Sequence, residues 1–231
     1  MVPSDTHHPS PGNWKLIPTS LLVGLLAWLL SLLALGAFHR QIAKPFPMQM
    51  DHQIQEAVHG HTTLVLTRIM FAFTWIGSPK VLFPVVPLLA ALLWWRRLRH
   101  EAVLLLVSMA GAGMLNSALK VHFHRSRPDV PWALVQEGSF SFPSGHSVFA
   151  VVLYGTLVYL ALRYLRRNLE RVALVSVAWV SIAGIGLSRI YLGAHYPSDV
   201  AAGYFVGCMW LITVITADWI ARMKWPTAGS R

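Results

Sequence analysis

Charged residues are scarce in this sequence: they make up 12% of its 231 residues, and only nine of them are acidic. Soluble domains usually contain about 25% charged residues, so this low share excludes a surface that faces water on all sides. The shortage of carboxylates argues against a hydrolase built on acidic metal ligands. A single cysteine, Cys208, excludes a framework of disulfide bonds. No period-2 alternation of apolar and polar residues is present, so we expect helices in place of strands.

Hydrophobic residues, in contrast, form 55% of the chain and gather in six stretches that contain no charged residue. These stretches are Leu16–Phe38, Val81–Trp95, Ala102–Leu119, Ser147–Leu162, Val172–Ser188 and Val200–Ala217. A helix needs roughly 20 residues to cross the hydrocarbon core. The first stretch reaches this length alone, and the others reach it with flanking residues. We therefore predict an all-α polytopic protein with six transmembrane helices in one membrane domain, residues 15–225, between short tails at 1–14 and 226–231.

The net charge of +10 is unevenly distributed along this threading. Basic residues gather in two short connections and near the two ends of the chain: Arg96, Arg97 and Arg99, then Arg163, Arg166, Arg167 and Arg171, with Lys15, Arg222, Lys224 and Arg231. All of them fall on one side of a six-helix bundle. The positive-inside rule predicts that this side and both termini are cytoplasmic. The basic residues are thus orientation signals, and we expect no nucleic-acid partner.

The first connection on the opposite side contains an apolar segment of its own. Residues 62–76 carry one charge, Arg68, and form either an interfacial helix or an extension of the second span. The break at Gly77-Ser78-Pro79 favours two separate pieces, because proline is common in the first turn of a new helix.

Three polar motifs follow on this outer side. They are Lys120-x6-Arg127-Pro128, then Phe142-Pro143-Ser144-Gly145-His146, and finally Ser188-Arg189-x5-His195-x3-Asp199. Their residue types suit a phosphate group. Lysine supplies a point charge, and the two arginines supply planar forks that match phosphate oxygens. Ser144 adds a hydroxyl donor, and Gly145 allows close backbone approach at the start of a helix, where free N–H groups attract anions.

Two histidines and one carboxylate supply the chemistry. His195 and Asp199 are about one helical turn apart, so the carboxylate can hold one ring nitrogen while the other attacks phosphorus. His146 can then protonate the leaving oxygen as a general acid and later activate water. This pattern predicts phosphoryl transfer through a phosphohistidine.

The three motifs together resemble, without a gap, the signature of the type 2 phosphatidic acid phosphatase superfamily, which also includes vanadium haloperoxidases and glucose-6-phosphatase. The resemblance implies phosphate binding by Lys120, Arg127, Ser144, Gly145, His146 and Arg189, a His195 nucleophile with Asp199 as its partner, and neither a metal nor a cofactor. For a chain of this length, the resemblance is to bacterial enzymes that dephosphorylate phosphatidylglycerophosphate, phosphatidic acid or undecaprenyl diphosphate. It therefore implies a lipid phosphate partner, the bacterial cytoplasmic membrane and a site facing the periplasm.

Other functions fit parts of the pattern. A transporter would also place charges within a bundle, but it would more often contain paired broken helices or internal repeats, and the sequence has no such repeat. Lipid A phosphatases and lipid-to-lipid phosphotransferases share the signature, so the substrate, the acceptor and the oligomeric state stay open.

Several residues near the motifs have an alternative role. Asp199 is also a candidate cap of the last helix. His122 and His124 form an H-x-H pair that lacks further ligands at zinc-site spacing, so we expect them to line the outer mouth. Arg125 lies outside the signature, and substrate contact by it stays open.

Overall fold

The structure, a computed structural model, describes residues 46–224, and every regular element in this range is a helix. The helices are α2 (Phe46–His59), α3 (Leu64–Ile76), α4 (Pro79–Trp95), α5 (Arg99–Phe123), α6 (Gly145–Ala161), α7 (Asn168–Tyr191) and α8 (Pro197–Lys224). The predicted first span, Leu16–Phe38, and both tails lie outside the described residues. The all-α prediction is confirmed for the described part of the chain.

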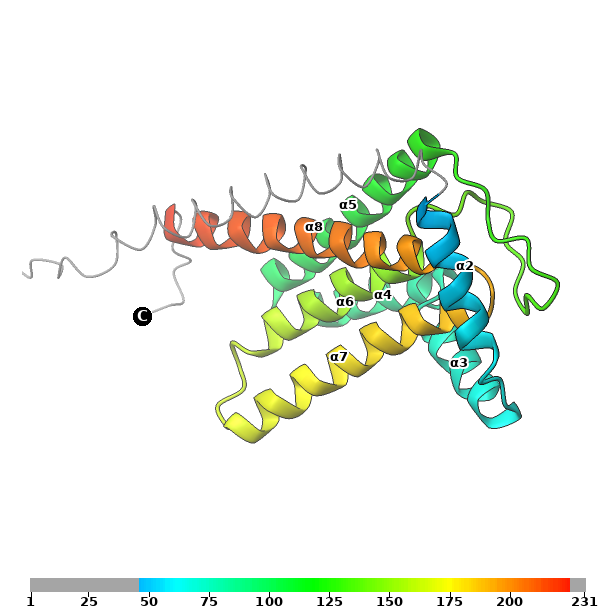
Figure 1. Cartoon of the computed structure of the whole chain (residues 1–231). Coiled ribbons are helices and arrows are strands. Elements are labelled where there is room, and N and C mark those ends of the chain that lie inside the picture. Colours follow the sequence, from blue (N-terminus) through cyan, green and yellow to red (C-terminus); the bar gives the residue numbers. More distant parts are fainter. Residues whose placement is uncertain (1–45, 225–231) are drawn as a thin grey trace, which may run out of the picture.

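The helices form a bundle around α6, which packs against α5, α7 and α8 (Figure 1). α4 lies against α5, and α3 lies against α7. The short helix α2 contacts α7 and α8 at the end of the bundle where the α5–α6 connection extends outward (Figure 1). Since α6 and α8 both begin at this end and α5 and α7 both end there, the three motifs meet at one end of the molecule.

Three single helices are long and apolar enough to cross a membrane: α5, α7 and residues Pro197–Met223 of α8. α3 and α4 pass the same test only as a pair, bent by 47° at the Gly77–Ser78 break, so the sequence break does separate two helices. α6 is apolar but has only 17 residues, a length of about 26 Å. The structure thus contains three or four candidate spans, and the count of six stays a prediction.

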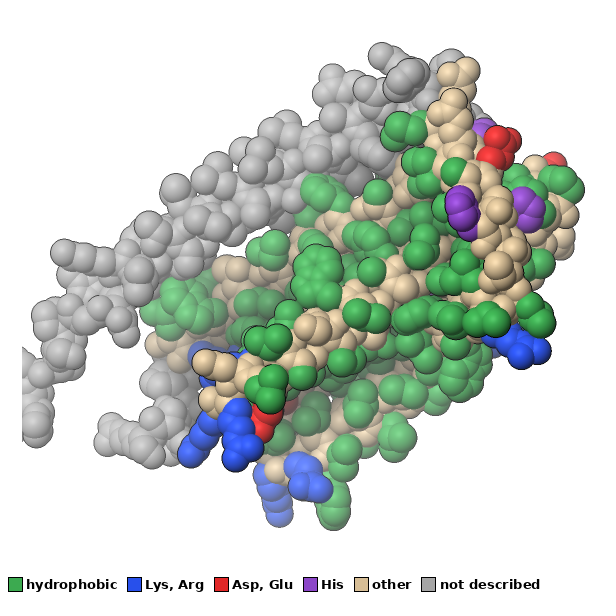
Figure 2. Space-filling view, turned by 60° about the horizontal axis from the view of Figure 1, so that its bottom comes forward, with side chains coloured by type: hydrophobic (Ala, Val, Ile, Leu, Met, Phe, Trp, Pro, Cys, Tyr) green, Lys and Arg blue, Asp and Glu red, His purple; other side chains and the backbone are tan. Residues whose placement is uncertain are grey.

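Both the core and the outer surface of the bundle are apolar. Val148, Val152 and Leu105 are fully buried, whereas Phe83 and Trp179 are 84% and 69% exposed. Figure 2 shows a surface of hydrophobic side chains, with most of the visible Lys and Arg at the end of the bundle away from α2 and a smaller basic group at the opposite end. Such a large apolar exterior is what a helix bundle presents to lipid.

Candidate active site

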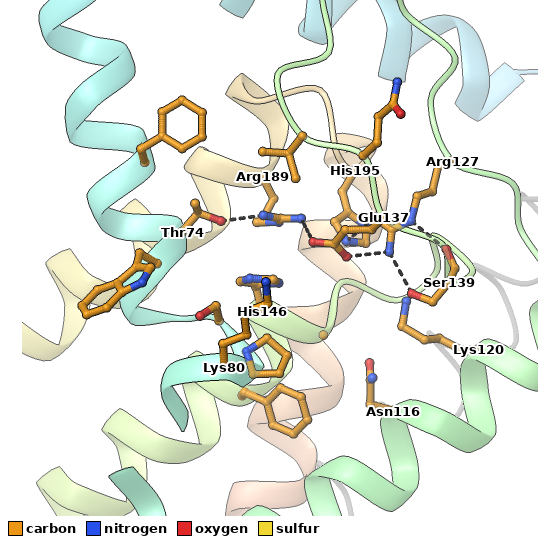
Figure 3. A pocket seen from close by; sticks show the side chains of 18 of the residues that line it. Thr74, Lys80, Asn116, Lys120, Arg127, Glu137, Ser139, His146, Arg189 and His195 are labelled. Atoms are coloured by element: carbon orange, nitrogen blue, oxygen red, sulfur yellow. Dashed lines mark hydrogen bonds and ion pairs between the residues drawn. The ribbon is translucent and has the colours of Figure 1, made fainter. Parts of the chain in front are cut away.

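A cavity of about 920 Å³ lies where the three motifs meet. Six of the predicted residues line it: Lys120, Arg127, Gly145, His146, Arg189 and His195 (Figure 3). They come from the end of α5, the α5–α6 connection, the start of α6, the end of α7 and the α7–α8 turn. The structure therefore brings these six residues together at one cavity, and their roles in binding and catalysis stay predictions.

The first motif begins in the last turn of α5, at Lys120, and ends in the connection that follows, at Arg127. This helix ends at Phe123, and His124 has left-handed backbone angles (φ 48°), which turn the chain out of the helix. Arg127 then reaches back over the cavity, where its guanidinium donates to the carbonyl oxygens of Ser139 (2.7 Å) and Ala194 (2.8 Å). These bonds hold the fork at the cavity wall, beside the Lys120 side chain.

The second motif forms the start of α6. Ser144 is the N-cap residue, and its Oγ accepts a hydrogen bond from the backbone N–H of Ser147 at 3.5 Å. The Ser144 side chain is fully buried. Accepting this bond does not use the O–H donor of the hydroxyl, so phosphate binding by Ser144 stays a prediction. Gly145 and His146 line the cavity in the first turn of α6, where helix N–H groups favour an anion.

The third motif spans the turn between α7 and α8. Arg189 is 1% exposed, and its NH1 donates to Thr74 Oγ1 of α3 at 2.5 Å. The backbone N–H of His195 returns to the carbonyl of Arg189 (3.2 Å) through a turn in which Gly193 has φ +72°. This tight return places the Arg189 fork and the His195 ring on the same cavity.

The two nitrogen atoms of the His195 ring face Asp199 and Arg127. Nδ1 lies 3.4 Å from Oδ2 of Asp199, and Nε2 lies 3.2 Å from NH1 of Arg127. Because a guanidinium has only donors, Nε2 must be an acceptor, and the ring proton must be on Nδ1 facing the carboxylate. Burial lowers the pKa of His195 to about 4, although Asp199 opposes this shift. The ring is therefore neutral near pH 7, which is the form that the predicted nucleophilic role requires.

The Asp199 carboxylate is fully buried and held by several groups that the sequence did not identify. Oδ2 accepts hydrogen bonds from the Ser141 hydroxyl and from the backbone N–H of Tyr196 (2.9 Å). Tyr196 directly precedes α8, and Asp199 is the third residue of α8. The bond from the Tyr196 backbone N–H to the Asp199 side chain is therefore the one that a capping box makes from its third helical residue back to the N-cap. The carboxylate thus both orients His195 and closes the start of α8.

Arg125 completes the surroundings of Asp199. Its NH1 donates to Oδ1 of Asp199 and its NH2 to Oδ2 of Asp51 in α2, both at 2.7 Å. Gln55, one turn further along α2, donates to the carbonyl of His195 at 3.1 Å. Helix α2 thus supports the third motif through a contact across 140 residues that no local pattern indicates.

Two more residues of the cavity escaped the sequence motifs. Asn116 lies one turn before Lys120 on α5 and points toward the cavity (Figure 3). Glu137, in the α5–α6 connection, accepts hydrogen bonds from both Arg127 and Arg189. The only sequence signal for Glu137 is that it is one of nine acidic residues and lies between two motifs.

The two histidine rings of the H-x-H pair contact different aromatic residues. His122 is in edge contact with Phe123, and His124 is in edge contact with Phe140. Among residues 46–224, no group of three or more His, Cys, Asp or Glu side chains could hold a metal ion. Metal independence nevertheless stays a prediction.

A second, apolar cavity adjoins the first. Its volume is about 590 Å³, and it lies between α4 and α5, with residues such as Leu82, Met109 and Met114 in its wall. Pro79 and Phe149 line both cavities. A polar, cationic chamber and an apolar groove on the flank of the bundle are therefore neighbours.

Comparison with known proteins gives a consistent result. A sequence profile of the PAP2 superfamily matches residues 101–223. Phosphatidylglycerophosphatase B of Bacillus subtilis (strain 168) is 33% identical over 145 residues, which are 62% of this chain and 71% of that protein.

Two crystal structures share the fold. A transmembrane PAP2-type phosphatidylglycerolphosphate phosphatase from Bacillus subtilis has a TM-score of 0.76 and 28% identity, with 85% of this chain and 96% of that one covered. Aquifex aeolicus LpxE has a TM-score of 0.58 and 23% identity, with 71% and 93% covered. The second likeness is one of fold alone.

Proposed function

This chain belongs to the PAP2 superfamily, and from this premise we propose that it hydrolyses a phosphate ester or diphosphate of a membrane lipid through a phosphohistidine on His195. The observation that carries the proposal is the position of His195 Nε2, 3.2 Å from the Arg127 fork in a cavity that Arg189 and His146 also line. Such donors stabilise the negative charge that shifts during phosphoryl transfer.

The proposed reaction has two steps. His195 Nε2 forms a bond to phosphorus while the bond to the leaving oxygen breaks, and His146 gives that oxygen a proton. Burial and the charge of Arg189 lower the pKa of His146 to about 3 in the free site, so His146 takes up this proton when the negatively charged substrate binds beside it. Asp199 stabilises the positive charge that develops on the His195 ring. Water then attacks the phosphohistidine, His146 takes up the proton of the water molecule, and the bond to His195 breaks to release inorganic phosphate. Every proton in this scheme is moved by side chains of the chain itself.

The apolar cavity supports a lipid as the substrate. A phosphate bound in the cationic chamber would leave its attached chains beside Leu82, Met109 and Met114, on a flank of the bundle that is itself apolar. A water-soluble phosphate ester would gain nothing from this groove. The lipid can enter sideways from the bilayer while its phosphate reaches His195.

Among the lipids, phosphatidylglycerophosphate is the first candidate, because the relative at 33% identity is a phosphatidylglycerophosphatase. Phosphatidic acid and undecaprenyl diphosphate are the others. We propose six spans in the bacterial cytoplasmic membrane, with both termini in the cytoplasm and the cavity on the periplasmic side. The distribution of basic residues supports this orientation.

A phosphate-release assay tests the proposal on purified protein in detergent, with the three lipids and an aryl phosphate as substrates. We expect release from at least one lipid, no effect of excess EDTA, inhibition by orthovanadate, and an acid-labile phosphoenzyme that His195→Ala lacks. Substantial activity in the purified His195→Ala variant would contradict the nucleophile. Loss on chelation, restored by one divalent ion, would contradict the metal-free mechanism.

A further inference from the structure

Glu137 occupies the part of the cavity that the substrate phosphate needs. Its Oε2 accepts a hydrogen bond from NH2 of Arg127 at 2.9 Å, and its Oε1 accepts one from NH2 of Arg189 (Figure 3). The carboxylate thus bridges the arginines of the first and third motifs. Two carboxylate oxygens and two phosphate oxygens present the same acceptors to an arginine fork, so the two groups compete for the same donors.

Glu137 is ionised in this position. Burial by itself would raise the pKa of the carboxyl group, but the charges of Arg189 and Arg127 outweigh burial and hold the pKa below its ordinary value. An arriving phosphate therefore meets two arginines whose charge is already partly neutralised. It binds fully only when the carboxylate moves away.

The surroundings allow that movement. The Glu137 side chain is 30% exposed, in a connection without regular secondary structure between α5 and α6. Glu137 and Arg127 also line two outer cavities of about 530 and 280 Å³ beside the catalytic one. Free space thus lies on both sides of the Glu137–Arg127 pair.

The two arginines, in contrast, stay anchored without Glu137. Arg189 keeps its bond to Thr74, and Arg127 keeps its bonds to the carbonyls of Ser139 and Ala194. The buried Nε of Arg189 has no partner within residues 46–224, so the fork also retains an unused donor. If the carboxylate moved away, the two guanidinium groups would stay in place and could bind an anion.

We propose that Glu137 fills the phosphate position between Arg127 and Arg189 until a lipid phosphate displaces it. This inference rests on the proposed function. Displacing Glu137 weakens the binding of every phosphate by the same factor. A lipid still binds, because its chains gain contacts in the apolar cavity, whereas inorganic phosphate has no other contact to hold it. Glu137 therefore keeps the affinity for inorganic phosphate low and helps to expel the product.

The test compares Glu137→Gln with Asp129→Asn, which removes a negative charge from an exposed position of the same connection. The dissociation constant of orthovanadate is measured by calorimetry on the purified full chain in detergent. We expect Glu137→Gln to bind vanadate about 10-fold more tightly than wild type, because a charge-assisted contact no longer competes. Asp129→Asn should bind as wild type does.

A second measurement uses the inhibition constant of inorganic phosphate in the hydrolysis of the preferred lipid. Glu137→Gln should lower this constant, because the product then binds more tightly, and Glu137→Ala should do the same if the glutamine variant fails to fold. Equal vanadate affinity in wild type and both variants would overturn the inference and leave the proposed function intact. Vanadate binding to none of them would overturn both.

Discussion

At the scale of single residues, Arg125 shows how a charged side chain near a signature acquires a different role. It is 9% exposed, its guanidinium bridges Asp51 and Asp199, and it lies 4.2 Å from the ring centre of Tyr196. Substrate contact was the open question for this residue. The geometry directs its donors to the carboxylate behind His195, whereas the Arg127 fork lies against Nε2 of His195, the proposed nucleophile.

We expect Arg125→Lys to lower kcat and to leave vanadate affinity near that of wild type, because a single ammonium cannot hold both carboxylates as the planar fork does. Arg125→Met should also lower the free energy of unfolding by about 3–5 kcal/mol, since it leaves buried carboxylates without a counter-charge. Arg127→Lys is the matched control and should weaken vanadate binding. Equal weakening by Arg125→Lys and Arg127→Lys would show that Arg125 contacts the phosphate.

At the scale of helices, the position of His146 depends on how closely α6 and α8 approach each other. A Cβ atom on Gly203 of α8 would lie 2.7 Å from the Ser144 carbonyl oxygen and 2.7 Å from the Ser147 Cβ. The backbone N–H of Ser144 also donates to the carbonyl of Asp199 at 3.0 Å. A missing side chain on α8 thus lets the second and third motifs meet.

Gly203→Ala should therefore move the start of α6 away from α8, reduce phosphate release and lower the unfolding free energy by about 1–3 kcal/mol, as overpacking does. Gly113→Ala on α5 is the control, because its Cβ would lie 3.8 Å from the nearest side chain, Phe149, and alanine favours a helix over glycine. Thermal unfolding and lipid turnover measure both effects. Wild-type activity and stability in Gly203→Ala would contradict the close contact.

At the scale of the whole molecule, the two ends of the bundle differ in chemistry. The cavity occupies one end. At the other end the fully buried Asp218 carboxylate of α8 accepts hydrogen bonds from Tyr159 (2.6 Å), Arg163 (2.5 Å) and Arg222 (3.1 Å), and it pairs with His100 of α5. This network joins α5, α6 and α8 beside the basic connections.

The orientation of these two ends can be measured with cysteine labelling in intact cells, after replacement of Cys208. A cysteine at Arg167, in the basic connection, should be shielded from a membrane-impermeant thiol reagent. A cysteine at Pro131, in the exposed α5–α6 connection, should react. The reverse pattern would place the cavity in the cytoplasm and contradict the proposed periplasmic site.

Several features of the fold followed from local sequence. The apolar stretches from Val81 onward predicted α4 to α8, because the length of an apolar run limits where a membrane helix can begin and end. The break at Gly77-Ser78-Pro79 predicted the division of α3 from α4. The spacing of His195 and Asp199 predicted their pairing, which the structure forms at 3.4 Å across the start of α8, since His195 lies two residues before the helix begins.

The sequence by itself thus determined the helical class, the apolar stretches of the described helices and the members of the three motifs, since each depends on composition or on spacing along the chain. Only the tertiary structure decided that Asp51 and Arg125 support Asp199 and that Glu137 lies between Arg127 and Arg189. These contacts join irregular connections to helices far away in the chain. No periodicity relates such positions, so the packing of the bundle alone determines which side chains meet.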